Sequence, residues 1–384
     1  MYLLDSKNIN QKLKEIFMVH QMNVLLGRDL LLPISEEIVF DNIDEINCFA
    51  EHFQQNMKKK GIEYTYDQAM LGSMICSILQ DSGSLKAVPP MVLDEMIKES
   101  RLFSALDFYD NPYLQNIRFS DQKIGNFKLT HNTYEKFEIF IYDVMKVNEY
   151  GVEIPRIGSF KEKFLYPCIM EGNTTWMSIT PNEIFTMKQH IEKAHGKVLT
   201  LGCGMGYFAY MAALKENVSK VVIVEKSPEV IELFKEYVLP QCSVKDKIEI
   251  VHADAFEYME SLEDGVFDYC FADIWKGNTN FEPYLKLKNI CKKFSLMETT
   301  YWIEESIAEG LINCVYLFIL NEYYRFKGRE PIDFKKNVQG EALYAFEVIE
   351  ILLKDVKITK VKELNAIMDY HTIIDMLSNN FLSV

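Results

Sequence analysis

The sequence predicts an α/β protein in which a mostly parallel sheet is covered by helices on both faces. Strand-type and helix-type segments alternate between residues 182 and 272, at a spacing typical of right-handed crossovers between parallel strands. An apolar strand pattern at Val198–Leu201 runs directly into a glycine-rich turn and a helix start. With 384 residues, the chain is also long enough for more than one compact unit.

Residues 1–112 predict a helical N-terminal domain. Ile46, Phe49, Phe53 and Met57 recur at helical spacing and form one apolar stripe. Thr65 is a suitable N-cap for a second helix, and Pro89-Pro90 marks the break before a third. No residue pattern in this region indicates chemistry.

Residues 113–178 predict a small β-rich layer. The segment 136–142 nearly alternates between polar and apolar residues, and glycine-containing turns interrupt the region near residues 125, 151 and 172. Short strands separated by such turns are typical of antiparallel hairpins.

Residues 179–384 predict the main α/β domain with a helical C-terminal extension. The expected elements are helix 182–194, strand 197–201, helix 207–214, strand 220–224, helix 228–237, strand 247–251, helix 255–261, strand 267–272 and later helices 301–323 and 341–353. Only residues 356–361 predict a strand after 276, so we expect the sheet to be truncated or capped by helices.

The turn after the first strand of this domain has the glycine spacing G-x-G-x-G at Gly202, Gly204 and Gly206. Glycines allow a sharp bend and let a ligand approach the backbone without a Cβ clash. A dinucleotide-binding turn needs a third glycine or alanine at the position of Tyr207, where the helix packs closely on the strand. Tyrosine fails that requirement, so the turn does not match the dinucleotide-binding fingerprint.

Two acidic residues follow the next two strands. Glu225 ends the second strand, 23 residues after Gly202, where a carboxylate can accept hydrogen bonds from both ribose hydroxyls. Asp254 follows the third strand. The order of a glycine turn and two acids after three successive strands is much more specific than either acid alone.

This arrangement resembles motif I and the following acids of the class I, Rossmann-like S-adenosylmethionine-dependent methyltransferases. The resemblance implies that S-adenosylmethionine is the cofactor, that Asp254 contacts the adenine amino group and that Ala255 contributes a backbone N–H. The predicted cofactor-binding residues are Gly202, Cys203, Gly204, Gly206, Glu225, Lys226, Asp254 and Ala255.

The fourth strand ends at Asp273, which we expect at the reacting end of the cofactor because ligands bind beyond the carboxyl ends of parallel strands. Methyl transfer is an in-line displacement that needs an aligned acceptor and, for an amine or hydroxyl, a proton-accepting group. Asp273 is therefore the candidate catalytic base or acceptor-orienting residue. Tyr207 and Trp275 are candidate walls of the acceptor pocket.

Within this superfamily, residues 170–275 are similar to the spermidine synthase branch. Gly172, Glu183 and Met187 match its layout of hairpin, acid and helix, and Asp273 matches the strand-four aspartate of aminopropyltransferases. The branch carries an aspartate within the glycine turn, where this chain has Met205. We therefore expect methyl transfer to a small amine, hydroxyl or carboxylate, with aminopropyl transfer and non-catalytic cofactor binding as alternatives.

Composition limits the remaining classes. The net charge of −15 opposes nucleic acid as a partner, and we expect a small-molecule acceptor and a possible homodimer. The eight cysteines form no C-x-x-C pair, and neither they nor the seven histidines have metal-ligand spacing, so no metal is expected. No signal peptide or membrane-length apolar segment is evident, which predicts a soluble cytoplasmic protein.

Overall fold

The computed structural model describes residues 1–118, 120–331 and 340–380. The chain divides into two compact units, each discontinuous in sequence. The sheet unit comprises residues 22–255 and 266–272, and the helical unit comprises residues 1–21, 256–265 and 273–384.

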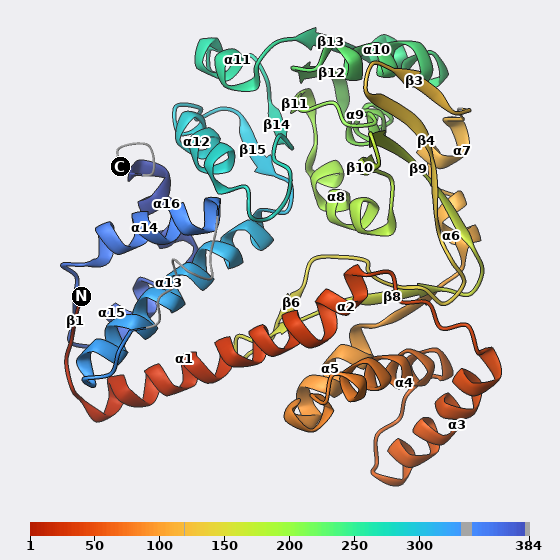
Figure 1. Cartoon of the computed structure of the whole chain (residues 1–384). Helices are drawn as coiled ribbons and strands as arrows, with labels where there is room; N and C mark the ends of the chain where they lie inside the picture. The colour runs from red at the N-terminus through yellow and green to blue at the C-terminus, as the bar shows by residue number, and fades with distance from the viewer. Residues whose placement is uncertain (119, 332–339, 381–384) are drawn as a thin grey trace. The chain divides into compact units, whose positions relative to one another are not determined.

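The sheet unit contains a parallel sheet (Figure 1). Its strands are β11 (Gly196–Leu201), β12 (Val218–Glu225), β13 (Ile248–His252) and β14 (Tyr269–Ala272), and they lie side by side in the order β13-β12-β11-β14. Leu199 of β11 pairs with Val222 on one side and with Cys270 on the other. All three side chains are buried, as expected for a central strand with apolar runs. The predicted α/β class is confirmed.

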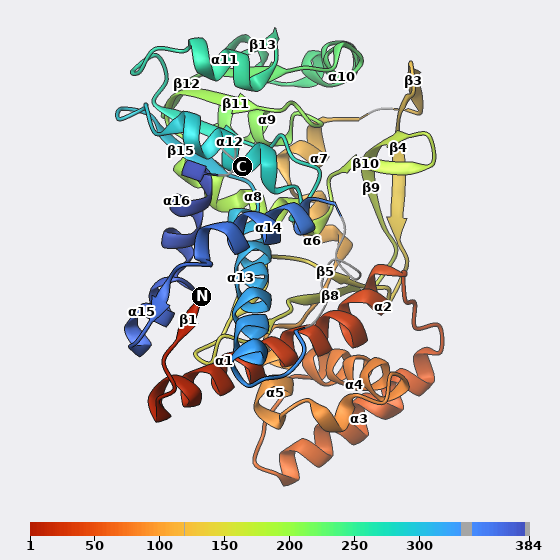
Figure 2. The ribbon, with the colours of Figure 1, turned by 60° about the vertical axis from the view of Figure 1, so that its left-hand side comes forward.

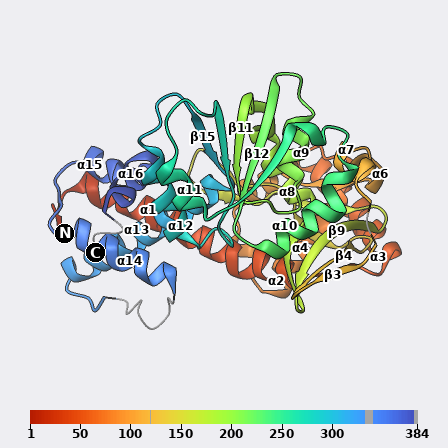
Figure 3. The same cartoon turned by 90° about the horizontal axis from the view of Figure 1, so that it is seen from above.

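The helices that connect these strands follow the predicted order. They are α8 (Pro181–Lys193), α9 (Tyr207–Ala213), α10 (Pro228–Leu233) with a π-helical continuation at Phe234–Val238, short 3₁₀ turns at Leu239–Gln241 and Lys245–Lys247, and α11 (Ala255–Ser261). Figure 3 shows α9 and α10 along β11 and β12. Ser227 caps α10, since its hydroxyl accepts from the Val230 N–H at 3.3 Å.

The predicted β-rich layer is present as several small sheets. A four-stranded antiparallel sheet has the order β10-β9-β4-β3 (Figure 2). Its strands are β3 (Gln122–Ile124), β4 (Phe127–Tyr134), β9 (Phe164–Glu171) and β10 (Thr174–Ser178). The smaller sheets contain β2 (Arg101–Phe103), β5 (Ile139–Ile141) and β8 (Ile157–Phe160), and the pair β6 (Lys146–Val147) and β7 (Glu153–Ile154).

The N-terminal part of the sheet unit is helical, as predicted. Its elements are the end of α1 (Lys7–Leu26), a π-helical segment Gly27–Leu31, α2 (Leu32–Ser35), α3 (Ile43–Lys59), α4 (Tyr66–Asp81), a 3₁₀ turn Leu85–Ala87, α5 (Pro90–Glu99), α6 (Ala105–Tyr109) and α7 (Pro112–Asn116). Thr65 and Gln68 form a capping box at the start of α4. The predicted stripe on α3 is only partly correct, because Ile46 is buried but Phe49 is 56% exposed.

The helical unit contains the rest of the chain. Its elements include β1 (Tyr2–Leu3), the first part of α1, α12 (Phe281–Cys291), β15 (Glu298–Tyr301), α13 (Glu304–Phe326), α14 (Glu341–Leu353), β16 (Lys357–Ile358), α15 (Val361–Ala366) and α16 (Tyr370–Asn380). The expectation that no clear strand other than 356–361 follows residue 276 is wrong, since β15 is a strand. Residues 356–361 contain only the short β16, which pairs in parallel with β1. Among the described residues, the helices lack a segment apolar and long enough to cross a membrane.

Candidate functional site

The glycine turn between β11 and α9 requires its glycines. Gly202, Gly204 and Gly206 have φ values of +94°, +53° and +74°, in the left-handed region that side chains disfavour. An added Cβ on Gly206 would lie 2.3 Å from a ring carbon of Phe234, so a side chain there would collide with the π-helical segment. The Gly206 N–H donates to the Cys203 carbonyl at 2.8 Å and closes the turn.

Glu225 lies at the end of β12 and connects this turn to the neighbouring strand. One carboxylate oxygen, Oε2, accepts from the Cys203 N–H at 2.9 Å. The other, Oε1, accepts from the backbone N–H groups of Lys226 at 2.8 Å and Ser227 at 2.7 Å. The residue is only 9% exposed, so these bonds form largely away from solvent. The predicted ribose-binding acid therefore also holds the turn in its conformation.

We next ask whether the Glu225 carboxylate can accept further hydrogen bonds from a ribose. Two carboxylate oxygens offer about four acceptor positions, and the three backbone N–H groups occupy three of them. One position, on Oε2, can accept from a hydroxyl without breaking an existing bond. Glu225 therefore fits one ribose hydroxyl directly, and a second would have to share an occupied position.

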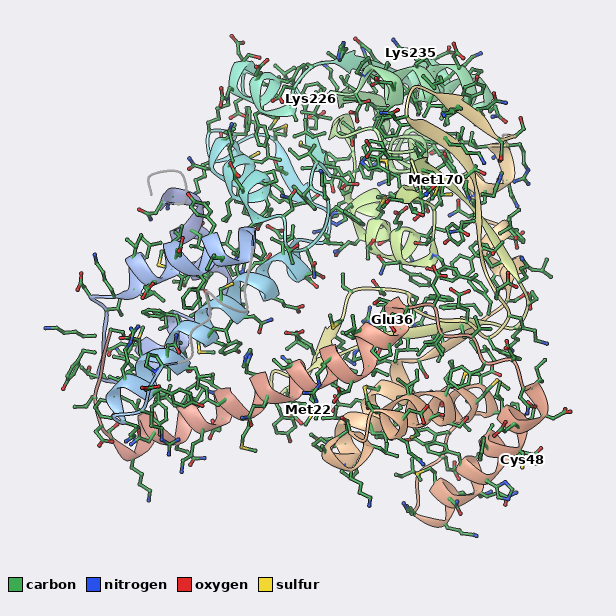
Figure 4. The ribbon with its side chains drawn as sticks, viewed as in Figure 1. Met22, Glu36, Cys48, Met170, Lys226 and Lys235 are labelled. Atoms are coloured by element: carbon green, nitrogen blue, oxygen red, sulfur yellow. The ribbon has the colours of Figure 1, made fainter. Side chains whose placement is uncertain are left out.

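Asp254 lies directly after β13 and forms an ion pair with Lys226. The Lys226 ammonium is 3.0 Å from the Asp254 carboxylate, and 79% of the lysine side chain is exposed (Figure 4). The Lys226 carbonyl is 3.1 Å from Nε2 of His252, the last residue of β13. Two predicted cofactor-binding residues, one after β12 and one after β13, thus meet at the same edge of the sheet. Ala255 follows Asp254 in the chain as the first residue of α11, and it is buried.

Cys203 contributes its backbone to the turn. Its side chain is 7% exposed, and burial together with the negative charge of Glu225 holds the pKa of its thiol well above the usual range. A neutral thiol is neither a strong nucleophile nor a metal ligand. Among the described residues, no three histidine, cysteine or acidic side chains are grouped to hold a metal ion.

Tyr207 is the first residue of α9 and is 4% exposed. Its hydroxyl oxygen accepts from the side-chain amide of Asn111 at 2.9 Å, and burial raises the pKa of Tyr207 to about 12. The ring also lies edge-on to Tyr113, with 5.5 Å between centroids. Its predicted contact with an acceptor stays a prediction.

Asp273 and Trp275 belong to the helical unit. Asp273 is half-buried and is the first residue after β14, as the sequence predicts. Trp275 is 5% exposed and packs with Tyr284 and Tyr301, at centroid distances of 5.7 and 6.3 Å. Their roles at an acceptor stay predictions.

The residues that carry the similarity to the spermidine synthase branch occupy the expected elements. Gly172, with φ of +60°, turns the β9–β10 hairpin, and Glu183 and Met187 lie on α8. Glu183 accepts from the Ser178 hydroxyl at 3.3 Å, which connects the hairpin to the helix.

Sequence reasoning missed the contribution of the segment 111–113. Asn111 contacts Tyr207, and the Tyr113 hydroxyl donates to the Met205 carbonyl at 2.6 Å. The only sequence signal is Asn111-Pro112, a favourable start for a helix, which says nothing about a turn more than 90 residues away.

A parallel sheet whose adjacent strand ends carry a glycine turn and two acids defines the cofactor-binding class of the Rossmann-like methyltransferases. Comparison with protein families agrees, because residues 192–303 match a family described as a methyltransferase domain. This segment thus matches a methyltransferase domain, in agreement with the predicted class I superfamily and its cofactor S-adenosylmethionine.

Several solved structures are similar to parts of the chain. The PRMT1 enzyme–prozyme complex of Trypanosoma brucei with AdoHcy is 21% identical, over 30% of this chain and 36% of that one, with a TM-score of 0.24. Spermidine synthase of Thermotoga maritima is 15% identical, over 50% and 62%, with a TM-score of 0.29. An SAH-bound methyltransferase of Podospora anserina is 19% identical, over 47% and 71%, with a TM-score of 0.29.

The chain spans less than half the length of the first two structures that it matches, 46% and 36%. A search of curated protein sequences finds no relative of this chain.

Proposed function

We propose that this protein transfers a methyl group from S-adenosylmethionine to a small-molecule acceptor that carries an amine, hydroxyl or carboxylate. The observation that carries the proposal is the hydrogen bond from the Cys203 N–H to Glu225, since it joins the glycine turn and the ribose acid into one site. The Lys226–Asp254 pair extends this site along the same edge of the sheet.

The positions of these residues after successive strands support the roles that we propose for them. Glu225 accepts from a ribose hydroxyl, Asp254 accepts from the adenine amino group, and the backbone of residues 202–206 lies against the methionine part. When bound, the cofactor supplies a sulfonium methyl group; the acceptor's electron pair bonds to its carbon while the sulfur keeps the electrons of the broken bond. Asp273 takes the proton that an amine or hydroxyl acceptor loses, and its negative charge favours the positive charge of the sulfonium.

Titration calorimetry on the full chain tests cofactor binding, with S-adenosylmethionine and S-adenosylhomocysteine as ligands. We expect both to bind. Decarboxylated S-adenosylmethionine serves as the comparison ligand, because tighter binding of this form would favour aminopropyl transfer instead. The absence of heat with all three compounds would contradict the proposal.

Turnover is tested by incubating the protein with methyl-labelled cofactor and a small-molecule extract. The Asp273→Asn variant should bind cofactor normally but lose most of the methyl transfer, whereas Asp246→Asn, at an exposed position, should change neither. A parallel fall of binding and turnover in Asp273→Asn would contradict the assigned role. Retained cofactor binding without transfer to any extract component would favour a non-catalytic binding protein.

A further inference from the structure

The peptide between Met205 and Gly206 lies at the end of the glycine turn, directly before α9. It is joined on one side to Gly206, which has no Cβ to restrict rotation about its N–Cα bond. In a ligand-binding turn, a rotation of this peptide would exchange the positions of an N–H donor and a carbonyl acceptor.

Both ends of this peptide are held by hydrogen bonds. Its N–H, from Gly206, donates to the Cys203 carbonyl at 2.8 Å within the turn. Its carbonyl, from Met205, accepts from the Tyr113 hydroxyl at 2.6 Å. The second bond comes from outside the methyltransferase domain, because Tyr113 lies 79 residues before the first matched position, 192.

The Tyr113 hydroxyl is well suited to this task. Tyr113 is fully buried and Met205 is 3% exposed, so water cannot readily replace the bond if it is lost. Burial holds the pKa of Tyr113 well above its usual value, so the hydroxyl keeps its proton and remains a donor. Its ring lies edge-on to Tyr207 and Tyr210, with 5.5 and 6.1 Å between centroids, which fixes its direction.

Asn111 holds Tyr113 and the start of α9 together. Its side-chain oxygen accepts from the Tyr113 N–H at 2.9 Å, and its side-chain nitrogen donates to the Tyr207 hydroxyl at 2.9 Å. At the other end of the segment, the Arg118 N–H donates to the Gln241 side chain at 2.9 Å, and Gln241 donates back to the Arg118 carbonyl at 2.6 Å. The segment 111–118 is therefore anchored at both ends.

We infer that Tyr113 is a positioning residue of the cofactor site, which acts through the Met205 carbonyl to hold the glycine turn in its ligand-binding conformation. This inference rests on the proposed function, since it takes the turn as the cofactor site. It also gives a role to residues outside the methyltransferase domain. Residues 111–113 supply hydrogen bonds that support the glycine turn from outside that domain.

The test compares Tyr113→Phe with Tyr142→Phe in the full chain. Tyr142 is also buried, and its hydroxyl also donates to a backbone carbonyl, that of Glu99 at 2.8 Å, but not in the turn. Both variants should lose similar amounts of thermal stability. Only Tyr113→Phe should weaken S-adenosylhomocysteine binding, by about tenfold, the effect of about 1.4 kcal/mol.

A second measurement needs no ligand. Hydrogen exchange of the amides at residues 202–206, followed by mass spectrometry, should be faster in Tyr113→Phe than in the wild-type protein and unchanged in Tyr142→Phe. If Tyr113→Phe does not fold, Asn111→Ala is the second variant, because it removes the acceptor of the Tyr113 N–H and so loosens the support of Tyr113; exchange in the turn should again be faster than in Tyr142→Phe.

The outcomes separate the two ideas. If both tyrosine variants bind S-adenosylhomocysteine as tightly as the wild-type protein does, the positioning role is overturned and the proposed function is left intact. If the turn exchanges faster in Tyr113→Phe but the protein binds none of the cofactor forms, Tyr113 does hold the turn and the proposed function is overturned. Unchanged exchange in the turn would overturn the inference irrespective of binding.

Discussion

Replacement of Glu225 by alanine should damage both the fold of the glycine turn and cofactor binding. The carboxylate accepts from three backbone N–H groups, and the one from Cys203 is buried. A buried N–H left without an acceptor costs about 1–3 kcal/mol, while those of Lys226 and Ser227 are partly buried and can be partly rehydrated. We therefore expect the free energy of unfolding to fall by about 3 kcal/mol.

Glu225→Gln should give an intermediate result. The glutamine side chain keeps one oxygen acceptor, but its NH₂ group faces at least one of the backbone N–H groups in either orientation. The loss should be smaller than in the alanine variant, and S-adenosylhomocysteine affinity should still fall because the ribose loses a charged acceptor.

The assay is urea denaturation together with calorimetric titration of S-adenosylhomocysteine. Glu249→Gln is the control, since Glu249 lies on the adjacent strand β13 but forms an exposed pair with Lys220, worth about 0–1 kcal/mol. Unchanged stability and unchanged affinity in Glu225→Ala would refute the view that this carboxylate connects turn and ligand.

Three further predictions concern single positions. Gly206→Ala should fold poorly, since its Cβ would lie 2.3 Å from the Phe234 ring at a φ of +74°; a soluble variant with wild-type melting temperature would contradict this. Alkylation by iodoacetamide at pH 8 should modify exposed Cys48, on α3 in Figure 4, much faster than Cys203, whose burial raises its pKa; equal rates by mass spectrometry would disagree. Hydrogen bonds from Arg28 and Ser84 lower the pKa of Asp29 to about 2, so the stability from its charge is present above pH 4 and disappears as the pH falls through 2. The Asp29→Asn variant should accordingly be destabilised relative to wild type at pH 5 and much less so at pH 2, as measured by urea unfolding.

The sequence predicted the first part of the methyltransferase domain, up to β14, accurately because its signals are local. Apolar runs, glycines and caps identify β11, α9 and β12 within one or two residues, and α11 spans the predicted residues 255–261. Helix α9 begins directly after Gly206, and α10 begins directly after Ser227, both residues with strong conformational preferences.

Other elements could not be predicted from local patterns. Strand β15 has the sequence Glu298-Thr299-Thr300-Tyr301, with no apolar alternation, so its strand conformation depends on tertiary pairing. The end of the predicted strand 356–361 instead starts the helix α15, where Glu363 accepts from the N–H groups of Thr359 and Lys360. Side chains reaching back to the backbone favoured a helix start over a longer strand.

The site shows the same contrast. Glu225 and Asp254 were identified from their positions after strands, because strand order fixes which ends lie together. Their partners were not, since the bonds of Glu225 to the turn and of Tyr113 to Met205 depend on the final packing. Sequence spacing predicts which residues reach a site but not which backbone groups they already bind.

A crystal structure of the full chain with S-adenosylhomocysteine tests the central claim most directly. We predict a ribose hydroxyl within hydrogen-bond distance of Glu225 Oε2, the adenine amino group at Asp254 and the backbone of residues 202–206 against the amino-acid part. A ligand bound elsewhere, or a ribose out of reach of Glu225 while the Cys203 bond is kept, would contradict the account.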